Sequence, residues 1–123
     1  SLPNNVLIEN QISPKAARMK SIQSMITMYY TMKGVHTSNI HYISSLRKLS
    51  ILPESNSDKK TTTYDQRKEY SIKYTNSIVK TDYPTWIDVF SKHKKKDDLA
   101  DCLLQSIWWL SNEKYIVLKE YKI

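Results

Sequence analysis

The sequence predicts an α/β protein in which short buried strands alternate with helices. Two short apolar runs, Asn5–Glu9 and Asn39–Ile43, have the length of strands, and a stretch with helical periodicity separates them. Such a β-α-β unit implies that the two strands run parallel. The 123 residues suit one domain and leave no room for two independent cores.

Composition excludes several classes of protein. The chain is 40% hydrophobic and 25% charged, which is ordinary for a globular protein and too apolar for a disordered one. No apolar run approaches the roughly 18 residues of a membrane helix, and no segment resembles a signal peptide. The single glycine, Gly34, excludes a glycine-rich phosphate loop. The single cysteine, Cys102, excludes an intramolecular disulfide and a multi-cysteine zinc site, and it favours a reducing compartment.

The net charge of +7 is unevenly distributed. Residues 1–53 contain one acid, Glu9, and the other eleven acids follow from Glu54 onward. A basic chain is attracted to polyanions because each Lys or Arg that meets a phosphate releases condensed counterions. A merely solvated basic surface is the alternative, and the charge alone modestly favours nucleic acid.

The first helix is expected over Pro14–Lys33. Ser13 can cap it, Pro14 suits its first turn, and Gly34 ends it. Apolar residues recur on one face at intervals of three and four, at Met19, Ile22, Met25, Ile26, Tyr29 and Met32. Packing against the sheet accounts for part of this apolar face. The face covers a wider arc of the helix than packing against the sheet alone requires.

Three further helices are expected in the second half of the chain. After a polar loop at Ser50–Thr63, a helix over Tyr64–Lys80 places Tyr70, Tyr74 and Ile78 on one face. Pro84 opens a short helix that carries Tyr83, Trp86, Ile87 and Phe90 on one side. A last helix runs from Asp97 to about Leu110 and is expected to bury Leu99, Cys102, Leu103, Ser106, Ile107 and Leu110. Tyr115–Leu118 is short and apolar and fits a helix or a strand equally.

Three aspartates cluster at the start of the last helix. Asp98 and Asp101 are three positions apart, and Asp97 and Asp101 four, so either pair shares a face. Two carboxylates about 4 Å apart repel by roughly 4 kcal/mol at an effective dielectric of 20, so the cluster needs compensation. The helix dipole, the preceding lysines or a divalent cation could provide it. The residues alone favour the dipole.

Glu9 closes a strand that is expected to be buried. A strand-end glutamate facing water is the simple interpretation. Because the carboxyl ends of strands form the functional edge of open α/β sheets, Glu9 could instead join a carboxylate-bearing helix in a two-metal site for phosphodiester hydrolysis.

Three segments together resemble the poxvirus-type Holliday junction resolvases, in the RuvC-like branch of the RNase H-like fold. Ile8-Glu9-Asn10-Gln11, followed by Ser13-Pro14-Lys15 and Met19-Lys20, is similar to the family's Ile-Glu-x-Gln strand-to-helix segment. Tyr64-Asp65-Gln66-Arg67-Lys68-Glu69-Tyr70-Ser71 is similar to its Tyr-x-x-Arg-Lys-x-x-Ser segment. Lys95-Lys96-Asp97-Asp98-Leu99-Ala100-Asp101 resembles its terminal helix. The three motifs occur in the family's order and spacing, over roughly residues 5–110.

The resemblance implies an RNase H-like mixed sheet flanked by helices, a homodimer, and nicking of four-way DNA junctions that requires Mg²⁺ or alternatively Mn²⁺. Glu9 matches the metal-binding glutamate of the central strand, and Asp98 and Asp101 match the paired aspartates of the last helix. Asp97 matches an additional acid, which is counted with Glu9, Asp98 and Asp101 among the expected metal ligands. Lys96 lies where a base near the scissile phosphate would be useful. The candidates for phosphate contact are Lys15, Arg18, Arg67, Lys68, Lys94 and Lys95.

One departure from the family concerns its first strand, which carries a catalytic aspartate in an Asp-(Ile/Val)-Gly sequence. No such sequence is present here, and no aspartate precedes Asp58. Two strands also make a poor sheet, since a stable one usually needs three or more. We therefore expect additional strands upstream of Ser1, and we expect this chain alone to be weak or inactive.

The resembled family uses the first helix in its dimer, and a symmetric substrate cut at two related sites also favours a two-fold partner. The expected interface residues are Ile22, Met25, Tyr29 and Met32. Tyrosines and tryptophans could stack on unpaired bases near a junction centre, although at most one of Trp108 and Trp109 fits a core. His36, His41 and His93 share no ligand spacing.

The hypothesis is thus a structure-selective, Mg²⁺-dependent DNA endonuclease that acts on branched DNA, with no membrane and no small-molecule cofactor. A catalytically silent nucleic-acid-binding or dimerisation module of the same fold is one alternative, and another RNase H-like nuclease is a second. The resemblance implies an intracellular protein, in a viral DNA replication compartment of the cytoplasm or, alternatively, in a mitochondrion.

Overall fold

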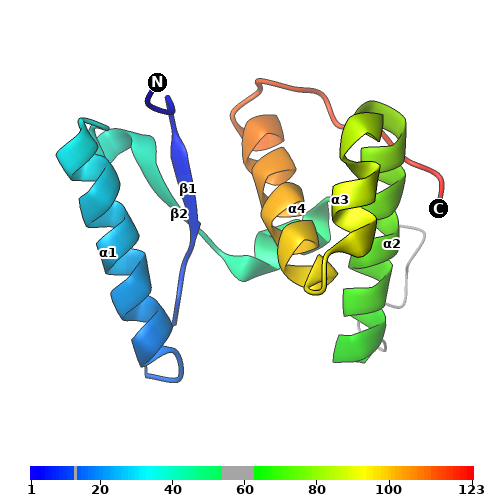
Figure 1. Cartoon of the computed structure of the whole chain (residues 1–123), viewed down its shortest axis with the longest axis horizontal. Helices are drawn as coiled ribbons and strands as arrows, with labels where there is room; N and C mark the ends of the chain where they lie inside the picture. Colours follow the sequence, from blue (N-terminus) through cyan, green and yellow to red (C-terminus); the bar gives the residue numbers. More distant parts are fainter. Residues whose placement is uncertain (13, 54–62) are drawn as a thin grey trace. The chain divides into compact units, whose positions relative to one another are not determined.

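A computed structural model describes residues 1–12, 14–53 and 63–123, and Figure 1 shows the course of the chain. The protein is a mostly helical α/β structure with a two-stranded parallel sheet. It divides into two compact units, residues 1–45 and residues 46–123, and each is described by itself. The predicted loop over Ser50–Thr63 lies largely outside the described residues.

The first unit contains the predicted β-α-β arrangement. Strand β1 (Val6–Glu9) pairs in parallel with β2 (Ile40–Ile43), and the register sets Val6 opposite Ile40. Helix α1 (Ala17–Lys33) and the short 3₁₀ helix η1 (Thr37–Asn39) connect them, and Figure 1 shows α1 lying along the two strands. Both strands and their parallel direction are confirmed.

The start of α1 differs from the prediction. Pro14–Ala16 form a turn, and the helix begins at Ala17, where the N-cap residue Ala16 provides no side-chain hydrogen bond. The predicted cap, Ser13, lies outside the described residues. The end is as predicted: Gly34 has φ 106°, in the left-handed region that glycine adopts without steric cost, and its N–H bonds to the Thr31 carbonyl at 3.1 Å.

The core of the first unit lies between the sheet and α1. Val6, Ile8, Val35 and Ile40 are buried there, and Tyr30 packs against them. Because side chains alternate across a strand, Glu9 lies on the opposite face from Val6 and Ile8.

Helix α1 buries less of its apolar face than its periodicity predicts. Its one fully buried residue is Gln23, whereas Met25 is 62% exposed and Met32 79% exposed. The face that meets the strands includes Gln23 and Thr27, whose hydroxyl shares a 2.7 Å hydrogen bond with the Tyr42 hydroxyl. The apolar stripe is therefore largely left without a partner in this unit.

The second unit is helical. It contains α2 (Tyr64–Asp82), α3 (Ile87–Lys92) and α4 (Lys96–Asn112), with 3₁₀ helices η2 (Ser45–Ser50) and η3 (Pro84–Trp86). Pro84 opens a helical segment as predicted, but its first turn is 3₁₀, and Phe90 is the buried residue of α3. Figure 1 shows α2 and α4 packed side by side.

The predicted apolar face of α2 forms the core of this unit. Tyr74 and Ile78 are each 1% exposed and pack with the fully buried Leu104 of α4. A capping box starts the helix, since the Thr63 hydroxyl accepts from the Gln66 N–H and the Gln66 side chain accepts from the Thr63 N–H.

The buried face of α4 is rotated from the predicted one. Ala100, Leu104, Gln105 and Trp109 are buried, whereas Cys102, which was expected inside, is exposed. The other five predicted positions are half-buried at Leu99, Leu103, Ser106, Ile107 and Leu110. Ala100 is 0% exposed and belongs to the face that packs against the rest of the unit. The apolar periodicity of the sequence did not predict its burial.

Residues Tyr115–Ile123 form neither helix nor strand, which answers a question that the sequence left open. The segment is held by the Tyr121 hydroxyl, which donates to the Asp82 carboxylate, and by Lys119, whose Nζ lies 3.3 Å from Asp82 Oδ1. The Tyr121 hydrogen bond, with a smaller contribution from Lys119, lowers the pKa of Asp82. Among the described residues, no helix has the length and apolar character of a membrane span.

One buried polar group in α2 gives a stability prediction. Thr75 is 1% exposed, and its hydroxyl has no hydrogen-bond partner among the described residues. A buried unsatisfied hydroxyl costs about 1–3 kcal/mol, so Thr75→Val, which keeps the shape, is expected to raise the free energy of unfolding by about 1 kcal/mol. Urea denaturation measures it, with Thr85→Val at an exposed position as the control. A destabilised Thr75→Val variant would show that the hydroxyl is satisfied.

Candidate functional site

Glu9 lies at the carboxyl end of β1, in the first unit. It is half-buried and stands opposite Ile43 in the parallel register. The following residues tie this strand end to α1, because the Gln11 N–H donates to Gln23 Oε1 at 2.8 Å. The Ile-Glu-x-Gln segment therefore has a local structural basis, in which Gln11 fixes the strand-to-helix connection and Glu9 ends the strand.

The three clustered aspartates lie in the second unit, in the first turns of α4. Asp97 and Asp98 belong to the first turn, where carboxylates complement the helix dipole. The structure thus supports the dipole explanation, and lysines also compensate the cluster.

Asp97 forms an ion pair with α2. Lys68 Nζ lies 2.9 Å from Asp97 Oδ2, and the Asp97 side chain is 18% exposed. The hydrogen bond from Lys68 lowers the pKa of Asp97, and the same bond raises the pKa of Lys68. Lys68, predicted to contact phosphate, is therefore partnered by an acid.

Asp101 forms the second ion pair, with η2. Lys48 Nζ lies 2.7 Å from Asp101 Oδ2, and both side chains are between 20% and 30% exposed, at 23% and 29%. Lys48 had no predicted role, because nothing local in the sequence links η2 to α4. The pair ties the start of the second unit to α4.

Asp98 is the third acid of the cluster. Its side chain is exposed, and it has no ion pair within residues 46–53 and 63–123. Carboxylate oxygens are the ligands that Mg²⁺ prefers, so the donor chemistry of Asp98 and Asp101 fits this ion. In the described part of the chain, no three His, Cys, Asp or Glu side chains gather as a ready-made metal group. A bound ion would therefore replace Lys48 at Asp101.

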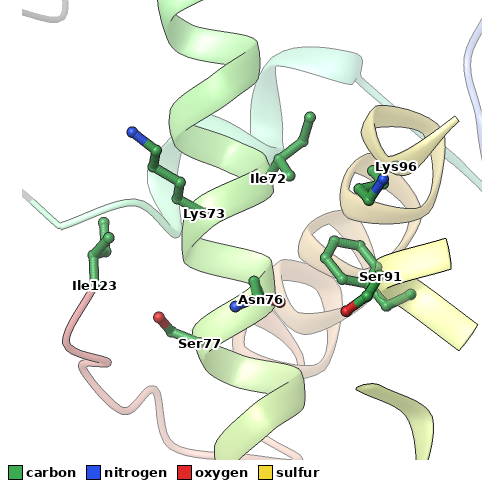
Figure 2. Close-up of a pocket in the computed structure, with 8 residues that line it drawn as sticks. Ile72, Lys73, Asn76, Ser77, Ser91, Lys96 and Ile123 are labelled. Carbon is green, nitrogen blue, oxygen red and sulfur yellow. The ribbon is translucent and has the colours of Figure 1, made fainter. Parts of the chain in front are cut away.

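Lys96 lies on another side of α4. At 100° per residue, it is roughly 160° around the helix from Asp98. It lines a pocket of about 340 Å³ together with Asn76 and Phe90. Figure 2 shows Lys96 on the same side of α2 as Ser91, whereas Lys73 and Ile123 lie on the other side. Its function as a base stays a prediction.

The other predicted phosphate contacts lie at the surface of both units. Lys15 and Arg18 are exposed around the start of α1, Lys94 and Lys95 are exposed between α3 and α4, and Arg67 is half-buried on α2. They stay predictions.

Sequence reasoning missed an aromatic–cation pair on α4. The Arg47 guanidinium lies over the Trp108 ring, 4.9 Å from its centroid. Trp108 is half-buried against the core of the second unit, and Trp109 is buried, so one of the two tryptophans is a core residue as predicted. Two histidines serve local structure: His36 Nδ1 accepts from the Ser38 N–H, and His93 Nδ1 accepts from the Lys95 N–H. His41 Nε2 lies 3.1 Å from Asn5 Oδ1.

The Lys68–Asp97 pair gives a pH prediction. Because folding lowers the pKa of Asp97 below its usual 3.8, the stability from this pair is present above pH 3.8 and is lost as pH falls through the lowered pKa. Asp97→Asn is therefore expected to reduce stability at pH 6, and the difference from wild type is expected to shrink towards pH 2. Urea midpoints at both pH values measure it.

The control is Glu69→Gln, which removes an exposed i,i+4 pair with Lys73 at 3.1 Å. Such a pair contributes only about 0.3–0.5 kcal/mol. If the loss of stability in Asp97→Asn relative to the wild type is the same at pH 6 and at pH 2, the assignment of the Lys68–Asp97 ion pair is wrong.

Comparison with known proteins adds one viral relative. The chain is 30% identical over 118 residues to an uncharacterized protein of Acanthamoeba polyphaga mimivirus, an alignment that covers 85% of this chain and 28% of that protein. The chain thus spans less than a third of the relative's length. No protein-family model matches the sequence, and no solved structure matches it.

Proposed function

We propose that the protein is a structure-selective, Mg²⁺-dependent DNA endonuclease of the RNase H-like, RuvC-like type that resolves four-way junctions. The observation that carries the proposal is the parallel β-α-β unit with Glu9 at the carboxyl end of β1, together with Asp98 and Asp101 on one long helix. These are the elements in which the resemblance to the poxvirus-type resolvases locates the metal ligands.

Each acid has a proposed role. Glu9, Asp98 and Asp101 would hold the metal, which would supply an activated water and stabilise the leaving oxygen at a phosphodiester. Asp97 was also expected among the metal ligands, but it pairs with Lys68 and would support the cluster from outside the metal set. Lys48 holds Asp101 in place until the ion binds and is then free to contact the DNA backbone.

The test is cleavage of a synthetic four-way junction by the full-length gene product in Mg²⁺. Substrates of matched sequence are the junction, a linear duplex, a flap and an RNA–DNA hybrid. We expect paired, symmetric nicks in the junction and none in the linear duplex. Preferential cutting of the hybrid or the flap would favour another RNase H-like nuclease.

A catalytically silent nucleic-acid-binding module is the second candidate. The ion pairs at Asp97 and Asp101 favour it, because two of the three helix acids already have structural partners. Junction binding without cleavage in Mg²⁺ or Mn²⁺ would support this module and contradict the endonuclease.

We also propose that the exposed stripe of α1 forms a homodimer interface. Met25, Tyr29 and Met32 are 56% to 79% exposed, at 62%, 56% and 79%, and Ile22 beside them is half-buried. A two-fold dimer suits a symmetric substrate. Met32→Glu is expected to shift the protein to monomer in sedimentation equilibrium, whereas Ser24→Glu, at an exposed position of α1 outside the stripe, leaves the dimer intact. Equal association by wild type and Met32→Glu would contradict the interface.

The site of action belongs to the same proposal. The mimivirus relative supports an origin in a large DNA virus. An endonuclease for branched DNA would act in the viral replication compartment of the cytoplasm, with a mitochondrion as the alternative. Tagged protein in infected cells would distinguish the two.

A further inference from the structure

The basic side chains that contact α4 have different kinds of partner. Lys48 and Lys68 are each held by a carboxylate, so each pair contributes no net charge. Arg47 is exposed, and among the described residues it has no acidic partner. Its guanidinium is held by the Trp108 ring instead, so no described carboxylate offsets its positive charge.

The ring also orients the arginine. Trp108 is half-buried against the core formed by α2 and α4, which fixes its ring plane. A guanidinium stacked on an aromatic ring keeps the donors along its edge available, and those donors match the oxygens of a phosphate in a bidentate arrangement. The pair therefore presents a preorganised phosphate-binding group.

The position of Trp108 relates this group to the aspartates. Trp108 is seven positions after Asp101, so the two side chains lie about 20° apart around α4. They lie on one stripe of the helix, roughly 10 Å apart along its axis. A DNA strand has one phosphate per about 3.4 Å of helix axis, so this separation corresponds to about three phosphates.

We propose that Arg47, stacked on Trp108, binds a DNA backbone phosphate about three nucleotides from the scissile phosphate, which the proposed Mg²⁺ would hold beside Asp101. This inference rests on the proposed function for its substrate and goes beyond it by adding a contact that no motif predicted. Trp108 is a positioning residue, because it acts through Arg47.

Junction binding at several salt concentrations tests the proposal, with Ca²⁺ in place of Mg²⁺ and with cleavage followed separately on denaturing gels. Arg47→Gln is expected to weaken binding about tenfold and to reduce the slope of log K against log salt by about 0.9, the value of one phosphate contact. Arg47→Lys is expected to keep the slope and lose part of the affinity. Trp108→Phe keeps an aromatic ring and should retain more affinity than Trp108→Leu, whose folding is checked by thermal melting.

The matched control is Lys73→Gln, which removes a basic side chain paired with Glu69 on α2. It should leave both affinity and slope close to wild type. An unchanged slope in Arg47→Gln, or an equal change in Lys73→Gln, would overturn the phosphate contact.

A neutral methylphosphonate placed at single positions of the cleaved strand locates the contact. The wild type should lose affinity when the replaced phosphate lies about three nucleotides from the cut, and Arg47→Gln should be insensitive there. If the protein binds junctions but never cuts them, the proposed endonuclease activity is contradicted, whereas the proposed Arg47 contact is not. The methylphosphonate is then placed at each position along the strand to locate that contact. If it cuts and Arg47→Gln binds normally, only the Arg47 contact fails.

Discussion

Asp101→Asn is expected to slow Mg²⁺-dependent junction cleavage by about a hundredfold or more, while junction affinity changes by less than about threefold. The amide keeps the shape of the side chain but loses the negative oxygen that a hard cation prefers. Loss of a charge-stabilising group at a reacting phosphate costs about 10²–10³ in rate. Single-turnover cleavage and gel-shift binding on the same protein preparation separate the two effects.

Two controls make this result specific. Asp88→Asn makes the same chemical change at an exposed position in the first turn of α3 and should cut like wild type. Lys48→Gln removes the partner of Asp101 without removing the carboxylate, and it should retain cleavage and need less Mg²⁺. Cleavage by Asp101→Asn at the wild-type rate would remove Asp101 from the site.

Leu104→Ala is expected to lower the free energy of unfolding of the second unit by about 3 kcal/mol. Leu104 is 0% exposed and packs with Tyr74 and Ile78 between α2 and α4. Truncation removes buried methyl groups and leaves a cavity that surrounding helices fill only in part, which costs about 2–5 kcal/mol. Since domains are commonly stable by only about 5–15 kcal/mol, the effect on the urea midpoint should be large.

The matched control is Leu46→Ala, the same substitution at a side chain that is 70% exposed. It should change stability by no more than about 0.5 kcal/mol. Similar midpoints for the two variants would contradict the packing of α4 on α2.

Local signals in the sequence were enough to predict the elements. The apolar runs placed both strands within one residue of their observed starts, since Val6 and Ile40 begin them. Gly34 ended α1 as expected because its positive φ is a local requirement. Tyr74 and Ile78 were placed on the buried face of α2 by their spacing.

Features that depend on tertiary contacts were not predictable in this way. Cys102 was expected to be buried because the prediction used apolar periodicity alone. The helix instead buries Ala100 and Gln105, and Cys102 is exposed. The compensation of the aspartates was foreseen, but the partners Lys48 and Lys68 come from elements far away in sequence. Arg47 was missed for the same reason, since its partner Trp108 lies on another element.

The candidate site itself was only partly open to prediction. Glu9 at a strand end and Asp98 at a helix start followed from residue type and position. The lysine at Asp101 was not foreseen, and it changes the chemistry, because metal binding becomes an exchange of one cation for another.

A crystal structure of the full-length gene product with Mn²⁺, located by its anomalous scattering, tests the central claim most directly. We expect one ion bound by carboxylate oxygens of Glu9, Asp98 and Asp101 at about 2.1–2.2 Å, with Lys48 displaced from Asp101. An ion that lacks Glu9 among its ligands, or an intact Lys48–Asp101 pair in crystals soaked to saturation, would contradict it.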